Sequence, residues 1–210
     1  PDAHDAAAED TRPDQDVRGH PIDLSPLANV PAQARFQGSR RGLGITDSAG
    51  WPHGLLRLRG EDYRLGPALQ LAPPGVALGA ASFPSEGPLI PLPDGAHAGL
   101  RLLLANQVQP EADGLKLRWH AADGRVLAAQ PVQVPTAWDT TIHGVERAHQ
   151  PLGDVALILR TAESRQRGGG SPQLLVYRVA LARPADARDA VAVSLQARAA
   201  TPLLLAISAD

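Results

Sequence analysis

PLIPLPDGAHAGLRLLLAN, residues Pro88–Asn106, is the stretch of the sequence that decides the fold class. A first apolar run, Leu89–Leu92, is followed by the turn residues Pro93-Asp94-Gly95, and a second run, Leu100–Ala105, begins a few residues later. Two strand-length runs around a Pro-Asp-Gly turn predict a β-hairpin. The rest of the chain repeats this plan of short strand, polar turn and short strand.

The clearest alternation of apolar and polar residues lies in the segment Leu115–Ala121. Leu115, Leu117, Trp119 and Ala121 fall on one side of a strand, and Lys116, Arg118 and His120 fall on the other. Order is expected to begin at His20–Leu27, where Ile22 and Leu24 share one face of an extended segment. Further strands are predicted at Leu55–Arg59, Ala68–Leu71, Val76–Ser82, Val126–Ala129, Val132–Val134, Val155–Thr161, Leu174–Leu181, Val191–Leu195 and Leu203–Ser208. Gly and Pro, 20 of each, interrupt any long helix. The sequence therefore predicts an all-β fold, an antiparallel β-sandwich or jelly roll.

The composition suggests one domain with a polar tail. Residues 1–19 are acidic, rich in Ala and poor in large apolar side chains, which predicts a disordered or extended tail or linker. A short helix over Ala3–Asp10 is the alternative. Residues 20–210 are predicted to form a single β-sandwich domain. Arg35–Trp51 and Glu163–Pro172 are expected to be long loops.

Overall charge and length exclude several classes of partner. The 210 residues carry a formal net charge of -2, so no basic field is present to attract nucleic acid or an anionic membrane surface. No run approaches the roughly 18 apolar residues of a membrane-spanning helix. Cysteine is absent, which excludes disulfides and thiolate chemistry. Because no initiating Met or signal-peptide core is present, we expect a processed or trimmed piece of a longer product.

No catalytic signature stands out in the sequence. Gly-x-Ser-x-Gly, His-Glu-x-x-His and phosphate-binding glycine patterns are missing, and Gly168-Gly169-Gly170 lacks the following Lys-Ser/Thr of a P-loop. Two acidic pairs, Glu61-Asp62 and Glu111 with Asp113, lie next to turns and are interpreted as solubility charges. The sequence therefore favours a non-catalytic role and leaves an enzyme as an alternative.

Sugar binding by β-sandwiches generally uses aromatic rings, on which the C–H groups of pyranoses pack. Trp119 and Tyr177 are in phase with neighbouring apolar residues, which predicts core packing for both. Trp51, beside His53, and Trp138, beside Asp139, lie in loop contexts. The candidate ligand-binding residues are therefore Trp51, His53, Trp138 and Asp139, with corner packing of the two tryptophans as the alternative.

Two metal sites are conceivable. The spacing His143-x-x-Glu146-x-x-His149 gathers three donors, but it is not a recognised zinc pattern. Asp23, Asn29 and Asp210 could join backbone carbonyls at a structural calcium site, since calcium prefers oxygen ligands. Simple solvation of these groups is the alternative. No other cofactor is expected.

Taken in order, several segments resemble the galactose-binding-like (jelly-roll) β-sandwich accessory domains of bacterial glycoside hydrolases. The matching segments are PIDLSPLAN (21–29), VALGAASF (76–83), PLIPLPDGAHAGLRLLLA (88–105), LKLRWHAADGRV (115–126), PTAW (135–138) and LLLAISA (203–209). The family's Asp-Gly-rich segment is replaced here by GWPHGLLRLRGEDYRLGPAL. The resemblance implies an exported protein, periplasmic or extracellular, that acts beside carbohydrate-processing enzymes.

Three hypotheses of function follow. The first is a non-catalytic module that binds glycan, or acts as a scaffold for an adjacent catalytic domain or protein partner. The second is a jelly-roll polysaccharide lyase or glycoside hydrolase, which requires an open groove lined by charged and aromatic side chains. The third is an assembly protein whose acidic tail, Asp2–Asp16, binds a protein partner.

Overall fold

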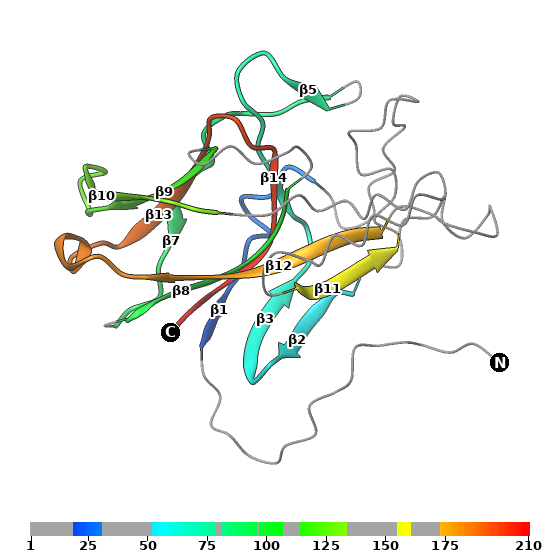
Figure 1. Ribbon diagram of the computed structural model, residues 1–210. Helices are drawn as coiled ribbons and strands as arrows, with labels where there is room; N and C mark the ends of the chain where they lie inside the picture. Colours follow the sequence, from blue (N-terminus) through cyan, green and yellow to red (C-terminus); the bar gives the residue numbers. More distant parts are fainter. Residues whose placement is uncertain are drawn as a thin grey trace, which may run out of the picture.

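The computed structural model describes residues 19–30, 52–78, 81–95, 97–106, 114–133, 155–160 and 173–210. Within these ranges the chain is built from antiparallel strands and one short 3-10 helix, η1 (Ala185–Ala187). The predicted all-β class and antiparallel sandwich are confirmed (Figure 1). The predicted tail over residues 1–19 and the loops Arg35–Trp51 and Glu163–Pro172 lie almost wholly outside the described residues.

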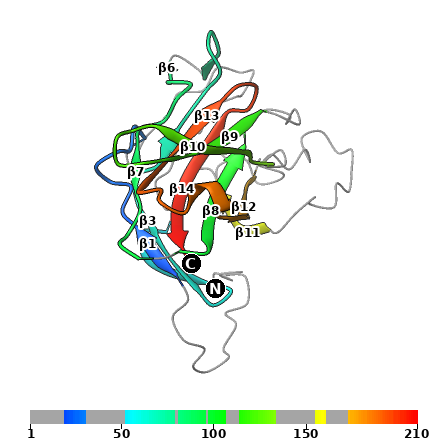
Figure 2. The ribbon, with the colours of Figure 1, turned by 90° about the vertical axis from the view of Figure 1, so that its left-hand side faces the viewer.

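In the described residues, the strands form two sheets and two hairpins. The six-stranded sheet has the order β1 (His20–Ile22), β14 (Pro202–Ala209), β8 (Gly99–Asn106), β12 (Gln173–Ala182) and β11 (Val155–Arg160), with β4 (Leu69–Gln70) pairing with β14. The four-stranded sheet has the order β10 (Val126–Pro131), β9 (Leu115–His120), β13 (Ala192–Ala197) and β7 (Ile90–Pro91), and Figure 2 shows it in front. The hairpins are β2 (Gly54–Leu58) with β3 (Glu61–Leu65), and β5 (Ala77–Leu78) with β6 (Ala81–Ser82).

The main core lies between the two sheets. Leu100, Leu102 and Leu104 of β8 belong to the same buried cluster as Leu117 and Trp119 of β9. The alternation of Leu115–Ala121 therefore has the predicted consequence, because its apolar side faces the other sheet. Trp119 and Tyr177 are both buried here, which confirms the prediction of core packing for each.

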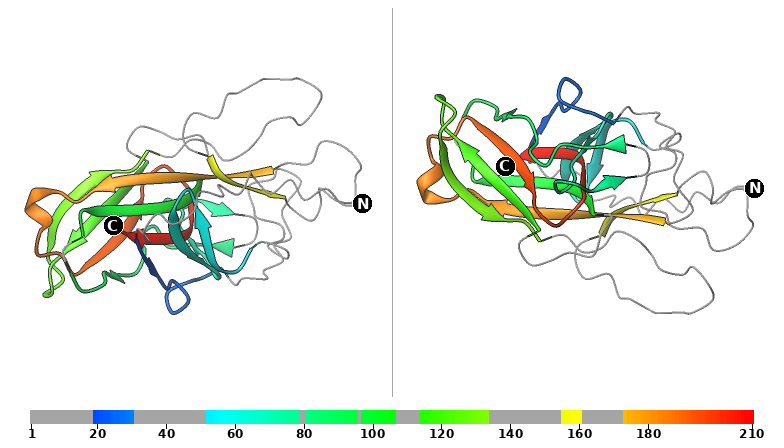
Figure 3. Two further views of the ribbon diagram at one scale, coloured as in Figure 1. Left: turned by 90° about the horizontal axis from the view of Figure 1, so that it is seen from below. Right: turned by 90° about the horizontal axis from the view of Figure 1, so that it is seen from above.

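A second core covers the opposite face of the six-stranded sheet. Leu103 of β8 and Leu203 of β14 pack there with Tyr63 and Leu65, which come from the β2–β3 hairpin. The four-stranded sheet and the hairpin thus lie on opposite sides of β8 and β14 (Figure 3). As a result, all eight residues of β14 are buried.

The β2–β3 hairpin was only half predicted from the sequence. The sequence pattern predicts a strand at Leu55–Arg59 but does not predict its partner, Glu61–Leu65. The turn between them is Arg59-Gly60, and both residues have positive φ, 53° and 80°. Positive φ at both positions is the requirement of the tight turn that matches the twist of a two-stranded hairpin.

The predicted hairpin around Pro93-Asp94-Gly95 is wrong. β7 pairs with β13 in the four-stranded sheet, whereas β8 pairs with β14 and β12 in the six-stranded sheet. The turn residues therefore carry the chain from one sheet to the other. His97 helps to fix this crossing, because its ring nitrogens lie 2.8 Å and 2.9 Å from the carbonyl oxygens of Pro93 and Asp210.

Of the other local predictions, two pairings agree with the structure and one strand does not. The Asp123-Gly124 turn joins β9 to β10 as an antiparallel pair, and β11 pairs with β12 as expected for Val155–Thr161 and Leu174–Leu181. The predicted strand Val76–Ser82 is instead the short pair β5 and β6. In the described part of the chain, no helix is long and apolar enough to cross a membrane.

Gly99 allows β8 and β12 to approach closely, and this generates a prediction. A Cβ at Gly99 would lie 2.3 Å from the backbone oxygen of Leu181, whereas a Cβ at Gly66 would meet nothing within 4 Å. We expect Gly99→Ala to lower the free energy of unfolding by about 2 kcal/mol, because backbone must move to relieve the clash. Gly66→Ala, the control, should change it by less than about 0.5 kcal/mol. Urea denaturation measures both values, and equal effects would contradict the described packing.

Candidate functional site

Most of the predicted ligand-binding residues cannot be placed. Trp51, Trp138 and Asp139 lie outside the described residues, as do His143, Glu146 and His149 of the possible metal pattern. His53 is described, and it lies exposed immediately before β2. The aromatic ligand site therefore stays a prediction.

The three residues of the predicted calcium site are not brought together. β1 pairs with β14 so that His20 faces Ala209 and Ile22 faces Ile207. Asp23 therefore follows the end of β1 that is far from Asp210, about 13 Å away at the rise of an extended strand. Asn29 holds β4 instead: its side-chain oxygen accepts from the Gln70 amide at 2.8 Å and its Nδ2 donates to the Gln70 carbonyl at 2.9 Å.

The Asp23 side chain is exposed to solvent. Hydrogen bonds from the Ser25 hydroxyl and backbone amide lower the pKa of the Asp23 carboxyl. Among the described residues, no group of three or more His, Asp or Glu side chains could hold a metal ion.

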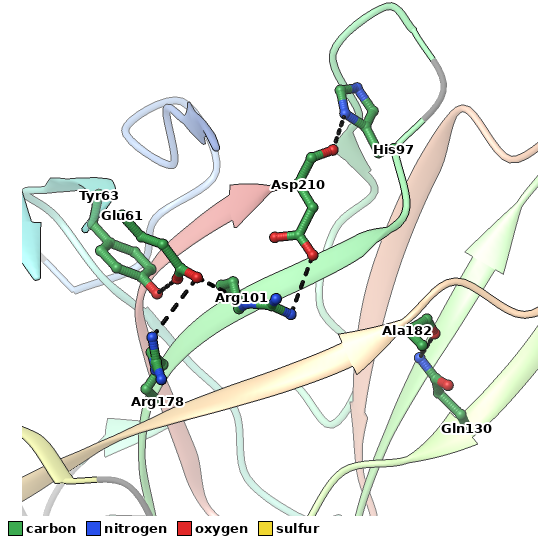
Figure 4. Close-up of polar contacts among 8 residues, drawn as sticks. All are labelled: Glu61, Tyr63, His97, Arg101, Gln130, Arg178, Ala182 and Asp210. Atoms are coloured by element: carbon green, nitrogen blue, oxygen red, sulfur yellow. Dashed lines mark hydrogen bonds and ion pairs between the residues drawn. The ribbon is translucent and has the colours of Figure 1, made fainter. Parts of the chain in front are cut away.

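A cluster of charged side chains fixes the β2–β3 hairpin to the six-stranded sheet (Figure 4). We call it the Glu61 cluster; its members are Glu61, Tyr63, Arg101, Arg178 and Asp210. Glu61 accepts from the Tyr63 hydroxyl at 2.7 Å and from Arg101 Nε at 3.0 Å, and Arg178 Nη1 lies 3.7 Å away. Arg101 Nη1 also lies 3.2 Å from the Asp210 carboxylate. One carboxylate of the hairpin thus joins β8 and β12.

The geometry of the Glu61 cluster suits attachment of the hairpin to the sheet rather than acid–base catalysis. A glycosidase leaves a sugar ring, and in inverting enzymes also a water, between its two carboxyl groups. Here the Arg101 guanidinium stands between Glu61 and Asp210 and binds both. Burial, followed by the hydrogen bond to Glu61, raises the pKa of Tyr63, so its phenol stays protonated and serves as a donor. This geometry indicates a structural role.

The interpretation of Glu61 as a solubility charge is wrong. Its side chain is 15% exposed and is shared by two arginines that lie far along the sequence. Asp62, the next residue, is partly exposed and pairs within the hairpin with the exposed Arg57 at 2.8 Å. Hydrogen bonding to Arg57 lowers the pKa of Asp62. Alternation of buried and exposed positions along β3 is the signal that could have separated the two acids.

A second polar array covers the outward side of the four-stranded sheet, which Figure 2 views from the front. We call this side the outer face. The strand register places Lys116, Arg118 and His120 of β9 beside Gln196, Ser194 and Ala192 of β13. Glu86, which precedes β7, bridges to Gln196 at the edge of the sheet. The outward direction of the three β9 side chains agrees with the alternation seen in the sequence.

Hydrogen bonds hold the polar groups of the outer face in place. Arg118 Nη1 donates a hydrogen bond to Glu86 Oε1, and Arg118 Nη2 donates one to Gln196 Oε1 at 2.8 Å. Gln196 Nε2 in turn donates to Glu86 at 3.1 Å. The three side chains form a closed ring of hydrogen bonds, and Glu86 remains 57% exposed. The arrangement presents preoriented donors and acceptors to solvent.

His120 and Ser194 form a separate pair on the outer face. His120 Nε2 lies 2.9 Å from the Ser194 hydroxyl, and His120 Nδ1 lies 3.1 Å from the Gly124 carbonyl oxygen. Since a carbonyl only accepts, the proton belongs on Nδ1 and the serine hydroxyl donates to Nε2. Serine hydrolases use the same two groups as nucleophile and base. Both residues are only 7% exposed, however, so we interpret the pair as a cross-strand contact that stiffens the face.

The adjacent acids Glu61 and Asp62 provide a matched test of the Glu61 cluster. Glu61→Gln removes the charge shared by Arg101 and Arg178 in a poorly hydrated site, so the free energy of unfolding should fall by about 2 kcal/mol. Asp62→Asn breaks an exposed pair and should cost less than about 1 kcal/mol. Denaturant titration of both variants measures the difference. Similar losses would show that the cluster does not anchor the hairpin.

Tyr63 should make stability depend on alkaline pH. The unfolded phenol ionises near pH 10.0, whereas the pKa of Tyr63 in the folded protein is raised. Its contribution is therefore complete below pH 10.0 and declines as the pH rises above that value. Tyr63→Phe should lose about 1 kcal/mol at neutral pH, and its disadvantage relative to the wild type should shrink above pH 10.0. A difference that is independent of pH in unfolding titrations would contradict this account.

Comparison with known proteins does not assign the chain to a family. It matches no protein-family model and no curated protein sequence. The Glu61 cluster and the outer face are therefore the features from which a function is inferred.

Proposed function

We propose that this chain is a non-catalytic β-sandwich module of an exported bacterial carbohydrate-processing system, where it binds glycan or acts as a scaffold. The galactose-binding-like resemblance of its segments motivates the proposal. In such a role the sandwich positions a surface or a neighbouring domain and performs no bond cleavage of its own.

The observation that carries the proposal is the filling of both faces of the six-stranded sheet. A lyase or hydrolase built on this sheet needs an open groove with charged and aromatic groups projecting from strands. Instead, Leu102 and Leu104 face the other sheet, while Leu103 and Leu203 lie beneath the β2–β3 hairpin. The described acids near this layer, Glu61 and Asp210, are bound to Arg101. This packing supports a module over an enzyme.

The test measures binding and cleavage on the same panel of polysaccharides. Affinity electrophoresis of the full chain should show retarded migration in at least one polysaccharide gel. Assays for new reducing ends and for unsaturated uronates should stay at the level of buffer for every polymer. Cleavage of any polymer would overturn the non-catalytic assignment. Unretarded migration throughout, with no cleavage, would remove the glycan-binding half and leave the scaffold.

A further inference from the structure

We propose that the outer face of the four-stranded sheet is a binding site for an anionic polysaccharide, with Lys116 and Arg118 as its cationic contacts. The inference rests on the glycan-binding half of the proposed function and names its site and ligand class. Three features of the outer face carry it: its solvent-facing position, its lack of stacking aromatics, and its charge.

The solvent-accessible part of the outer face is the region around Glu86, Lys116, Arg118 and Gln196, whereas His120, Ser194 and Ala192 beside them are buried. The strand register fixes which outward side chains are neighbours, with β10 and β13 on either side of β9. β7 pairs along the other edge of β13. Unlike the outward side of the six-stranded sheet, this face has no described hairpin packed on it. Lys116 and Arg118 are two positions apart on one strand, about 7 Å, so they meet successive groups of an extended polymer.

The residue types on the outer face disfavour stacking on a neutral sugar. The side chains that the register turns outward are Glu86, Pro91, Lys116, Arg118, His120, Val126, Ala129, Pro131, Ala192, Ser194 and Gln196. None of these described residues is Trp, Tyr or Phe, the rings on which pyranose C–H groups pack. Without rings for stacking, the polar contacts that this face offers a sugar are the charges and hydrogen-bonding groups of Lys116, Arg118, Glu86 and Gln196.

The charges of the outer face favour an anionic ligand. Lys116 stands opposite Gln196 on one side and Pro131 on the other, neither of which is acidic. Among the described residues, the acid on the face is Glu86, and it is bound by Arg118 and Gln196. That ring keeps the guanidinium of Arg118 oriented before any ligand arrives, which reduces the entropy lost on binding. Guanidinium and ammonium groups make strong charge-assisted hydrogen bonds to carboxylate or sulfate.

Glu86 and Lys116 allow a test with two opposite expected effects, because Glu86 repels an anion at the place where Lys116 attracts one. Lys116→Gln should weaken binding of polygalacturonate about tenfold, the effect of one charge-assisted contact. Glu86→Gln keeps an acceptor for Arg118 but removes the negative charge, and it should tighten binding. Arg64→Gln is the control: it deletes one exposed cation from β3 on the opposite side of the six-stranded sheet and should leave binding unchanged.

Isothermal titration at low ionic strength measures the dissociation constants for polygalacturonate, dextran sulfate, neutral dextran and polyglutamate. Comparison of polygalacturonate with dextran sulfate separates carboxylate from sulfate recognition. Binding to either polymer supports the site if Lys116→Gln weakens it and Glu86→Gln tightens it. Equal binding to dextran or to polyglutamate overturns the ligand class. If the wild type binds a glycan but Lys116→Gln and Glu86→Gln behave like the control, the site is wrong while the proposed function stands. If it binds no polysaccharide, the glycan-binding half fails with this inference, and the scaffold remains.

Discussion

The burial of β8 and β14 on both faces is the constraint on which the rest of the structure depends. Successive side chains of a strand point to opposite sides, so a strand covered on both sides must be apolar throughout. In β8, Leu102 and Leu104 enter one core while Leu103 enters the other. Arg101 of β8 is charged and only partly exposed, and Glu61 of the hairpin pairs with it. The leucine-rich composition and the Glu61 cluster are thus two consequences of one layered arrangement.

This layering also divides the surface into two kinds. The side of the six-stranded sheet beneath the β2–β3 hairpin is occupied by apolar side chains that pack together and by the ion pairs of the Glu61 cluster. The outer face of the four-stranded sheet, by contrast, carries polar side chains joined by short hydrogen bonds at fixed positions, such as Arg118 to Gln196. Rigid polar groups on a sheet lose little entropy on binding.

The sequence predicted elements better than it predicted pairings. Leu115–Ala121 alternates because one side meets the core, and that pattern is visible without a structure. The turn at Pro93-Asp94-Gly95 was recognised, but turn chemistry does not determine whether the chain returns beside the same strand or crosses to another sheet. Pairing of β8 with β14 joins residues about a hundred positions apart, which no local pattern encodes.

The candidate sites follow the same rule. The orientation of Lys116, Arg118 and His120 could be predicted from alternation, whereas their partner Glu86 lies 32 residues from Arg118. Glu61 was misread because its adjacency to a turn was visible and its contact with Arg101, 40 residues away, was not. Short-range periodicity therefore identifies the faces of strands, and long-range pairing decides which charges are buried.

Native-state hydrogen exchange of individual amides tests the central claim most directly. If β8 and β14 are enclosed by the four-stranded sheet on one side and the β2–β3 hairpin on the other, their amides should exchange only through global unfolding. The amides of β10, at the edge of the four-stranded sheet, should open at much lower free energy. Exchange of β8 and β14 as fast as that of β10 would contradict the doubly covered sheet.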